Sequence, residues 1–351
     1  MTNEVRRKDE WTEPGTYEVD TGVYRIPLPL PNDGLKAVNV YAILGSESLT
    51  LIDSGWALEQ AREALESALR VLGCEIGDVD RFLVTHVHRD HYTQALALRE
   101  LFGIPIALGE GERPTLELLT DPEYEGLAPH FDLLRSHGAS EVVDRLKAQR
   151  VGATSAKTIW EMPDIWLQDK DEIELPSRTL KVIHTPGHTQ GHVVFADEAG
   201  GMLFAGDHVL PHITPSIGFE PKPGSLPLGN YLASLRLVRT LPDMRLLPAH
   251  GPVAPSVHAR ADEILLHHDQ RLSSALNAII DGATTAFHVA QRLPWTGRLR
   301  TFDSLDPFNQ MLAVLEIAAH LDLLVVQEQL AARFVNGIHY YEVVANESGD
   351  S

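Results

Sequence analysis

The chain has 351 residues, of which 44% are hydrophobic and 22% charged, a balance typical of a globular protein with a sizeable core. Its 29 basic and 49 acidic residues give a formal net charge of −20, which disfavours nonspecific binding to the phosphate backbone of nucleic acids. The single cysteine, Cys74, excludes an internal disulfide framework and a cysteine-rich zinc site. Any bound metal would therefore be held by histidine and carboxylate side chains.

The N-terminal segment is polar and mixed in charge. It lacks the apolar stretch of a secretory signal, and we interpret residues 1–16 as a flexible leader. Elsewhere the apolar runs fall short of the ~18–20 residues that cross a bilayer. We therefore expect a cytoplasmic protein with no membrane partner.

Residues 37–110 read as an α/β unit with short connections. Apolar, β-branched runs predict strands, and apolar residues at helical spacing that stop at Gly73 and Gly103 predict helices. The expected order is strand 37–44, strand 48–55, helix 57–73, strand 81–88, helix 91–103 and strand 104–112.

The pattern returns after a helix-prone segment, residues 112–160. We interpret this segment as a helical insertion, which is either plain packing or a lid over a substrate pocket. The second half then repeats the α/β pattern, with strands that again end in His or Asp. These elements are strands at 180–189, 192–197, 201–209 and 244–250, and a helix at 230–241.

From residue 257 the character changes to helical. Helices are expected at 258–282, 284–293 and 309–324, followed by a hairpin around Asn336-Gly337. This is the outline of a winged helix, so we divide the chain into a catalytic domain at 17–256 and a winged-helix-like α+β domain at 257–345. The recognition-helix candidate, 309–324, has no Lys or Arg to contact phosphates. A structural, pocket-closing or dimerising module is favoured over DNA binding, and a homodimer is possible.

The stretch THVHRDHYTQ, residues 85–94, places His86, His88, Asp90 and His91 within six positions. Such a cluster is too crowded for one ion, but two ions can share it. The ligands still missing should lie where other strands end. The sequence offers His188, Asp207 and His250, each beside Gly or Pro after an apolar run.

Taken together, these motifs resemble those of the metallo-β-lactamase fold hydrolases. The order is H-x-H-x-D-H at 86–91, G-H-T-x-G-H at 187–192, G-D at 206–207 and A-H-G at 249–251. The resemblance covers about residues 20–255. It implies an αβ/βα sandwich of two mixed sheets with outer helices and a dinuclear metal site at one edge.

The resemblance also assigns the ligands. His86, His88 and His188 would hold one divalent ion, Asp90, His91 and His250 the other, and Asp207 would bridge the two. Zinc is expected, and the ligand types leave iron and manganese open.

Four further residues are candidates for support of the metals or for the substrate pocket. Asp53 matches the family's early Asp-x-Gly turn, which supports the site from behind the ligands. His192 and His208 flank the ligand motifs and Tyr92 follows His91; for each, packing or a structural role competes with a pocket role. His184 is expected to be structural, and His267 and His268 are expected to be solvated on a surface helix.

The implied activity is a dinuclear hydrolase in which a metal-bridging hydroxide attacks a carbonyl and Asp90 orients it and takes its proton. The apolar, Pro- and Gly-rich segment 208–231 suits a small ester, thioester or lactone.

Branches of the family leave alternatives open. The winged-helix outline resembles the β-lactamase-like-2 branch, which includes a single-strand-specific endoribonuclease. The ligand set also resembles glyoxalase-II-type thioesterases, whose basic glutathione-binding residues are not matched. Leu210 stands where lactonases of the family carry a tyrosine. A weak or promiscuous β-lactamase is a further alternative.

Overall fold

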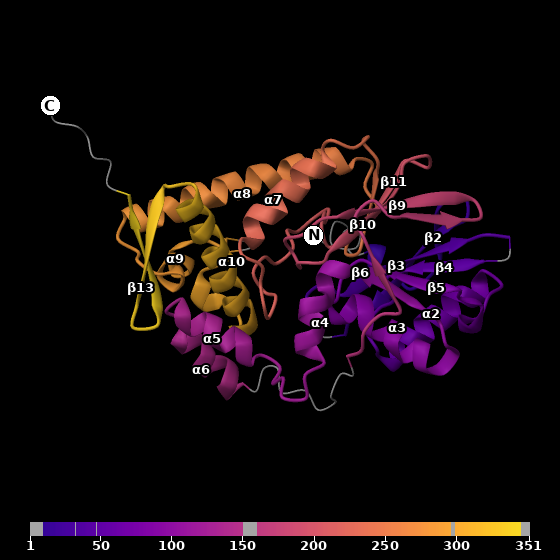
Figure 1. The fold of residues 1–351 in the computed structure, drawn as a ribbon, viewed down its shortest axis with the longest axis horizontal. Helices are drawn as coiled ribbons and strands as arrows, with labels where there is room; N and C mark the ends of the chain where they lie inside the picture. The colour runs from indigo at the N-terminus through magenta and orange to yellow at the C-terminus, as the bar shows by residue number, and fades with distance from the viewer. Residues whose placement is uncertain (1–9, 32, 47, 150–159, 296–298, 345–351) are drawn as a thin grey trace. The chain divides into compact units, whose positions relative to one another are not determined.

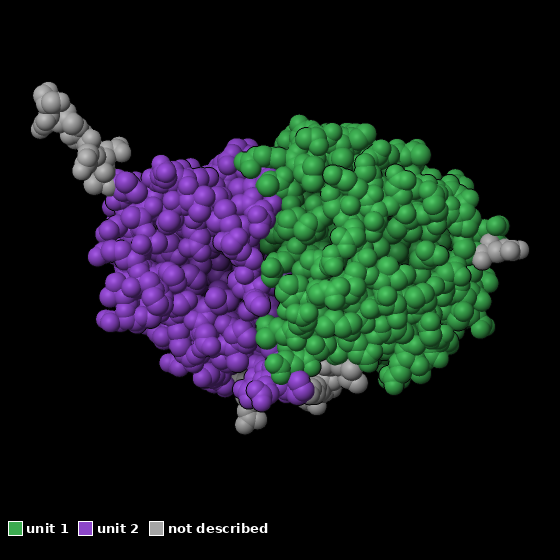
Figure 2. Space-filling view, in the orientation of Figure 1, with its two compact units in different colours: residues 1–121, 158–215, 233–262 green, residues 122–157, 216–232, 263–351 purple. Residues whose placement is uncertain are grey.

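The structure, a computed structural model, describes residues 10–31, 33–46, 48–149, 160–295 and 299–344. It divides into two compact units, each built from separated stretches of chain (Figure 2). Unit 1 comprises residues 1–121, 158–215 and 233–262, and unit 2 comprises 122–157, 216–232 and 263–351. The predicted insertion at 112–160 is thus shared between the units, and its residues 150–159 lie outside the described part.

Unit 1 contains two sheets. The first has seven strands in chain order, antiparallel from β1 to β4 and parallel from β4 to β7. Its strands are β1 (Tyr17–Asp20), β2 (Val23–Pro29), β3 (Ala37–Leu44), β4 (Leu49–Ile52), β5 (Arg81–Val84), β6 (Ile106–Gly109) and β7 (Ile165–Leu167).

The second sheet has five strands in the order β12-β11-β10-β9-β8, with only β11 and β12 parallel. They are β8 (Glu172–Leu175), β9 (Arg178–His184), β10 (Val193–Asp197), β11 (Met202–Gly206) and β12 (Arg245–Pro248). Two mixed sheets with flanking helices confirm the predicted α/β sandwich.

Alternation along strand β5 shows how the layers are held. Leu83 joins an apolar cluster that draws on both sheets, whereas Phe82 and Val84 join a second cluster on the opposite face. That second cluster includes buried residues of α2 (Glu59–Val71) and α3 (Arg89–Phe102), which cover the outer face of the first sheet (Figure 1). Helix α3 ends at Gly103, whose φ of 72° provides the left-handed C-cap expected from the sequence.

The remaining helices of unit 1 are shorter or continue into unit 2. After β6 come a 3-10 turn, η3 (Glu110–Glu112), and α4 (Arg113–Leu119). Helix α7 (Pro227–Val238) and helix α8 (Val257–Ile280) each begin in one unit and end in the other. The other 3-10 turns of the chain are η1 (Glu10–Thr12), η2 (Ile76–Asp78) and η4 (Phe302–Ser304).

Unit 2 packs helices around α10 (Pro307–Val326), whose capping side chain is Asp306. Helices α5 (Ala128–Ser136), α6 (Ser140–Ala148) and α9 (Ala286–Arg292) contact α10, and β13 (Leu330–Val335) pairs with β14 (Ile338–Val343). The hairpin turns at Asn336 and Gly337, both with positive φ, as the sequence predicts.

Helix α10 has unusual apolar character. Within the described residues it is the one helix whose length and composition would allow it to cross a membrane, and 67% of that stretch is buried inside the protein. Such burial is typical of the core helix of a globular protein.

Several details differ from the sequence-based expectations. Strands β1 and β2 were not predicted from the sequence; Pro27 and Pro29 argue against a strand, although β2 accommodates both. Residues 10–16 are the described part of the predicted flexible leader, and within them the Trp11 carbonyl accepts a hydrogen bond from Arg25 Nη1 at 2.7 Å. Helix α10 continues to Val326, where the sequence suggested that the hairpin was already starting.

The expectation for His268 is also wrong. His267 is exposed, but His268 is only 1% exposed, and its Nδ1 lies 3.2 Å from His320 Nε2. Burial, reinforced by His320, lowers the pKa of His268 to about 2. Burial likewise lowers the pKa of His320 to about 4.

These buried histidines predict an acid-sensitive unit 2. An unfolded histidine binds a proton below about pH 6.5, whereas the folded His320 stays neutral until about pH 4. The contribution of these neutral histidines to the free energy of unfolding is therefore fully present above pH 6.5. It falls as the pH drops from 6.5 to 4, by up to about 1.4 kcal/mol per pH unit for each such group.

Urea unfolding between pH 7 and pH 4.5 checks this. We expect His268→Gln to reduce the slope of unfolding free energy against pH, and His267→Gln, its exposed neighbour, to keep the wild-type slope. Equal slopes for the two variants would contradict the prediction.

Candidate metal centre

The seven predicted ligands lie where strands of both sheets end. His86 follows β5, and His88, Asp90 and His91 form the N-cap and first turn of α3. His188 lies in the loop from β9 to β10, and Asp207 directly follows β11. His250 follows β12. Carboxyl ends of neighbouring parallel strands share an edge, which brings side chains from distant parts of the sequence together.

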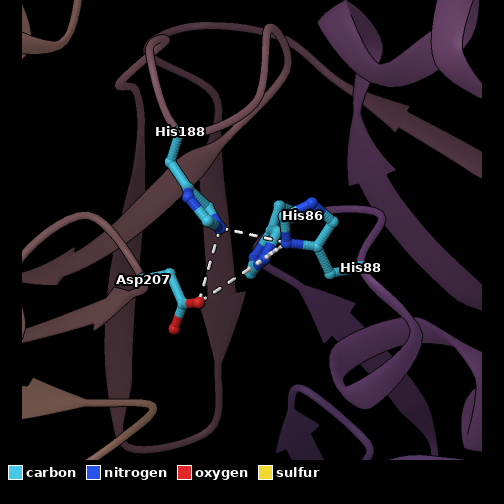
Figure 3. A group of neighbouring side chains, drawn as sticks. All are labelled: His86, His88, His188 and Asp207. Carbon is cyan, nitrogen blue, oxygen red and sulfur yellow. Dashed lines mark hydrogen bonds and ion pairs between the residues drawn. The ribbon is translucent and has the colours of Figure 1, made fainter. Parts of the chain in front are cut away.

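The first group is formed by His86, His88, His188 and Asp207 (Figure 3). His88 Nδ1 lies 3.0 Å from His86 Nε2 and 3.0 Å from His188 Nε2. Asp207 Oδ2 lies 3.4 Å from His188 Nε2 and 4.0 Å from His86 Nε2. Four ligands at about 2.0–2.2 Å around a tetrahedral ion lie about 3.3–3.6 Å from one another, so this spacing suits one ion.

The second group is formed by Asp90, His91 and His250. Asp90 Oδ2 lies 3.4 Å from His250 Nε2 and 3.7 Å from His91 Nε2. Asp207 contributes here through its other oxygen, since Oδ1 lies 3.4 Å from His250 Nε2 and 3.7 Å from His91 Nε2. The Asp207 carboxylate therefore faces both groups, one oxygen to each, as expected for a bridging ligand.

Unsatisfied atoms test whether these residues suit metal ions. Buried polar atoms normally form hydrogen bonds. His91 Nε2, His250 Nε2 and Asp207 Oδ1 are buried and form no hydrogen bond among the described residues. All three point to the same small space, and all are donor types that divalent transition metals accept. The residues fit two ions.

Asp53 orients a ligand of the second group, on the side of that ligand that faces away from the metal position. It occupies the left-handed region with φ of 60° at the end of β4, a conformation that Asp tolerates better than most residues. Its Oδ2 accepts a hydrogen bond from His91 Nδ1 at 2.9 Å, and its Oδ1 accepts one from the Thr85 backbone N–H at 2.8 Å. The bond to Nδ1 leaves His91 Nε2 facing the metal position, which is the supporting role predicted for Asp53.

His250 is fixed by residues that the sequence did not single out. Its Nδ1 donates to the Ala37 carbonyl at 2.8 Å, so its Nε2 faces the metal position. Asn39 Nδ2 donates to the Pro248 and Gly251 carbonyls at 2.9 and 2.8 Å, bracketing His250. A buried polar residue inside an apolar strand is the signal that would have found Asn39.

Charge is balanced within the centre. Burial raises the pKa of Asp90 and of Asp207, but the neighbouring histidines outweigh it and hold both pKa values below the ordinary range. Burial lowers the pKa of His91, yet Asp53, Asp90 and Asp207 together raise it to about 10. Both ligand carboxylates are therefore ionised at neutral pH and attract cations.

His192 supports Asp207. It is fully buried, and its Nε2 accepts the Asp207 backbone N–H at 3.2 Å while its Nδ1 lies 2.9 Å from Thr185 Oγ1. Its ring stacks on His86 with centroids 5.0 Å apart. His208 is also fully buried and belongs to neither metal group; burial lowers its pKa to about 3.

Tyr92 does not join the centre. It is fully buried in the apolar cluster beneath α3, and its hydroxyl donates to the Glu161 carbonyl at 2.9 Å. The pocket role considered for Tyr92 is therefore wrong, and the competing expectation of helix packing is correct. His184 likewise serves the loop, with its Nε2 2.8 Å from the Gln190 carbonyl oxygen.

The family follows from a match over most of the catalytic region. The family model of the metallo-beta-lactamase superfamily matches residues 33–250. The chain belongs to this superfamily. It is a metal-dependent hydrolase with two candidate metal-binding groups.

Relatives extend the similarity beyond that region. The chain is 26% identical over 339 residues to the probable metallo-hydrolase YqjP of Bacillus subtilis (strain 168), covering 93% of this chain and 98% of the relative. It is 29% identical to the beta-lactamase-like protein 2 homolog of Caenorhabditis elegans, over 77% of each chain.

Solved structures are similar over almost the whole chain as well. A metallo-beta-lactamase family protein of Thermus thermophilus superposes with a TM-score of 0.77 at 27% identity, covering 93% of this chain and 100% of that chain. A beta-lactamase domain protein of Burkholderia ambifaria gives a TM-score of 0.77 at 27% identity over 94% of each chain.

The shared carboxylate makes a prediction about metal content. Asp207→Ala removes a ligand from both groups, so we expect it to weaken binding of both ions by at least about tenfold. His250→Ala removes a ligand from the second group only and should leave one ion tightly bound. Metal analysis of each purified protein after dialysis against a weak chelator measures this.

His212→Ala, at an exposed histidine of the same unit, is the control. It should bind as many ions as the wild type. Loss of a single ion in Asp207→Ala would show that the carboxylate serves only one group.

Proposed function

We propose that the protein hydrolyses a small ester, thioester or lactone with two zinc ions in its metal centre, and that it does so in the cytoplasm. The observation that carries the proposal is the pair of donor groups joined by Asp207. Imidazole and carboxylate donors at tetrahedral spacing suit zinc, and hydrolytic zinc sites use this ligand chemistry.

Two bound divalent cations would lower the pKa of water and polarise a carbonyl oxygen, which supplies hydroxide near neutral pH. The side chains of the protein would position the attacking water. Asp90 is ionised and its side chain is 14% exposed, so it can accept a hydrogen bond from the attacking water and orient it. His91 and His250 keep Asp90 in place through contacts of 3.7 and 3.4 Å.

Charges around the centre favour a neutral carbonyl compound over a phosphate ester. Phosphate recognition relies on Arg or Lys side chains that pair with the oxygens. Arg89, which lies between two of the ligands in sequence, is already engaged, with its guanidinium 4.1 Å above the Trp56 ring and 3.4 Å from Asp33. The chain as a whole carries a net charge of −20.

The structure of unit 2 also weighs against nucleic acid as substrate. The candidate recognition helix, α10, has no Lys or Arg, and most of its residues are buried. A helix that reads a groove must present an exposed face with positive charge. A structural or dimerising role is the better proposal for this unit.

The position three residues after Asp207 bears on lactones. Leu210 is 1% exposed, and its carbonyl accepts a hydrogen bond from Arg260 Nε at 2.6 Å. An apolar, buried side chain there offers no hydroxyl to a substrate. Simple esters and thioesters are therefore proposed ahead of acyl-homoserine lactones.

A substrate panel tests this. The zinc-loaded protein would be assayed on p-nitrophenyl butyrate, an acyl-thioester, an acyl-homoserine lactone, a chromogenic cephalosporin and a labelled single-stranded RNA. We expect ester or thioester turnover to exceed the other reactions by at least tenfold and to vanish in Asp90→Asn. Asp90→Asn keeps the shape of the side chain and removes its charge. Cleavage of RNA or cephalosporin without ester turnover would refute the proposed substrate class.

A further inference from the structure

A buried carboxylate outside the ligand set lies next to the loop that carries His188. Glu112 ends the 3-10 turn that follows β6, and it is 0% exposed. Burial of a carboxylate is costly unless hydrogen bonds compensate for the lost hydration. Its position therefore calls for a partner.

That partner is Thr189. The Thr189 hydroxyl donates a hydrogen bond to Glu112 Oε1, and both side chains are fully buried. Thr189 directly follows the metal ligand His188 in the chain. The hydrogen bond therefore ties the residue next to His188 to the segment that follows β6.

The backbones of the two segments also touch. A Cβ atom added to Gly191 would lie 2.0 Å from the Glu112 backbone nitrogen, and one added to Gly111 would lie 2.7 Å from Gly191 Cα. No side chain fits at either position, so both glycines are required for this close approach. The segment of Glu112 is thus packed directly against the loop at 187–191.

Other hydrogen bonds also restrain the loop: Ser234 Oγ donates to the Pro186 carbonyl at 2.9 Å, and His184 Nε2 lies 2.8 Å from the Gln190 carbonyl oxygen. Thr185 N–H donates to the His192 carbonyl at 2.8 Å and closes the base of the loop. Gly187 N–H donates to the Thr189 carbonyl at 2.9 Å and shapes its turn. The hydrogen bond from Thr189 to Glu112 anchors the tip of the loop to the segment that follows a different strand, β6.

We propose that Glu112 is a positioning residue for the first metal ion: through Thr189 it fixes the loop so that His188 Nε2 stays in the ligand group. This inference rests on the proposed metal centre. His188 Nε2 lies 3.0 Å from His88 Nδ1 and 3.4 Å from Asp207 Oδ2, so a shift of the loop by about an ångström would break the tetrahedral spacing.

Thr189→Val is the central test, because valine keeps the volume of threonine and removes the hydroxyl. Affinities for the two ions are measured by competition with a chromophoric chelator, using Zn²⁺ alone as the probe. We expect one ion to bind about 10- to 100-fold more weakly and the other to keep its affinity, as for loss of a partner behind a metal ligand. Glu112→Gln should lie between this variant and the wild type, because its amide oxygen still accepts the hydroxyl.

Thr179→Val is the matched control. Thr179 Oγ1 also donates to a glutamate, Glu174, at 2.9 Å, but on the exposed surface of β8 and β9. It should bind both ions as tightly as the wild type. The visible absorption of the Co²⁺-loaded proteins provides a second measurement, expected to change in Thr189→Val and not in Thr179→Val.

Wild-type affinity for both ions in Thr189→Val, or an equal loss of both, would overturn the proposal. If Thr189→Val fails to fold, the same criteria apply to Glu112→Gln. A wild-type protein that binds two ions but hydrolyses no ester contradicts only the proposed substrate class, because chelator competition reports the ligand group without catalysis.

Discussion

The site depends on the contacts of one carboxylate, that of Asp207, because each of its two oxygens faces a different group of histidines. Without it the chain would present two separate incomplete ligand groups. With it, two cations can lie close together, and their repulsion is offset by a shared negative charge. This requirement explains why side chains from both sheets must meet at one edge of unit 1.

The architecture meets that requirement through close packing of strand ends. Gly206 has a φ of 50°, and a Cβ atom there would lie 2.7 Å from Thr85 Cβ, so the end of β11 packs closely against the residue that follows β5. Val193 N–H donates to the Thr85 carbonyl at 2.9 Å and closes the same seam. The ligands therefore extend from closely packed, hydrogen-bonded backbone, and buried partners such as Asp53 and His192 orient them.

Much of the site could be predicted from the sequence, because its ligands follow apolar strands in recognisable motifs. Strand β3 was predicted at its observed bounds, and the helix ending before Gly103 was also correct. The misses have physical causes. Pro27 argues against a strand at the position of β2. The burial of His268 depends on its contact with His320, which lies 52 residues later in the chain.

Supporting residues are harder to foresee than ligands. Glu112 contacts the distant Thr189 hydroxyl and Asn39 the distant Pro248 carbonyl, and a single sequence does not show which distant segment will pack against them. The segment GEGE at 109–112 offered one indication, because glycines beside an acidic residue at a strand end suggest that another backbone segment approaches closely there. Substrate choice depends on the shape around the metals, which strand periodicity does not encode.

Anomalous diffraction at the zinc edge, from crystals of the zinc-loaded protein, tests the central claim most directly. The account predicts two peaks about 3.5–4 Å apart, one beside His86, His88 and His188, the other beside Asp90, His91 and His250, with one Asp207 oxygen bound to each. A single peak, or two peaks with Asp207 bound to only one of them, would contradict it.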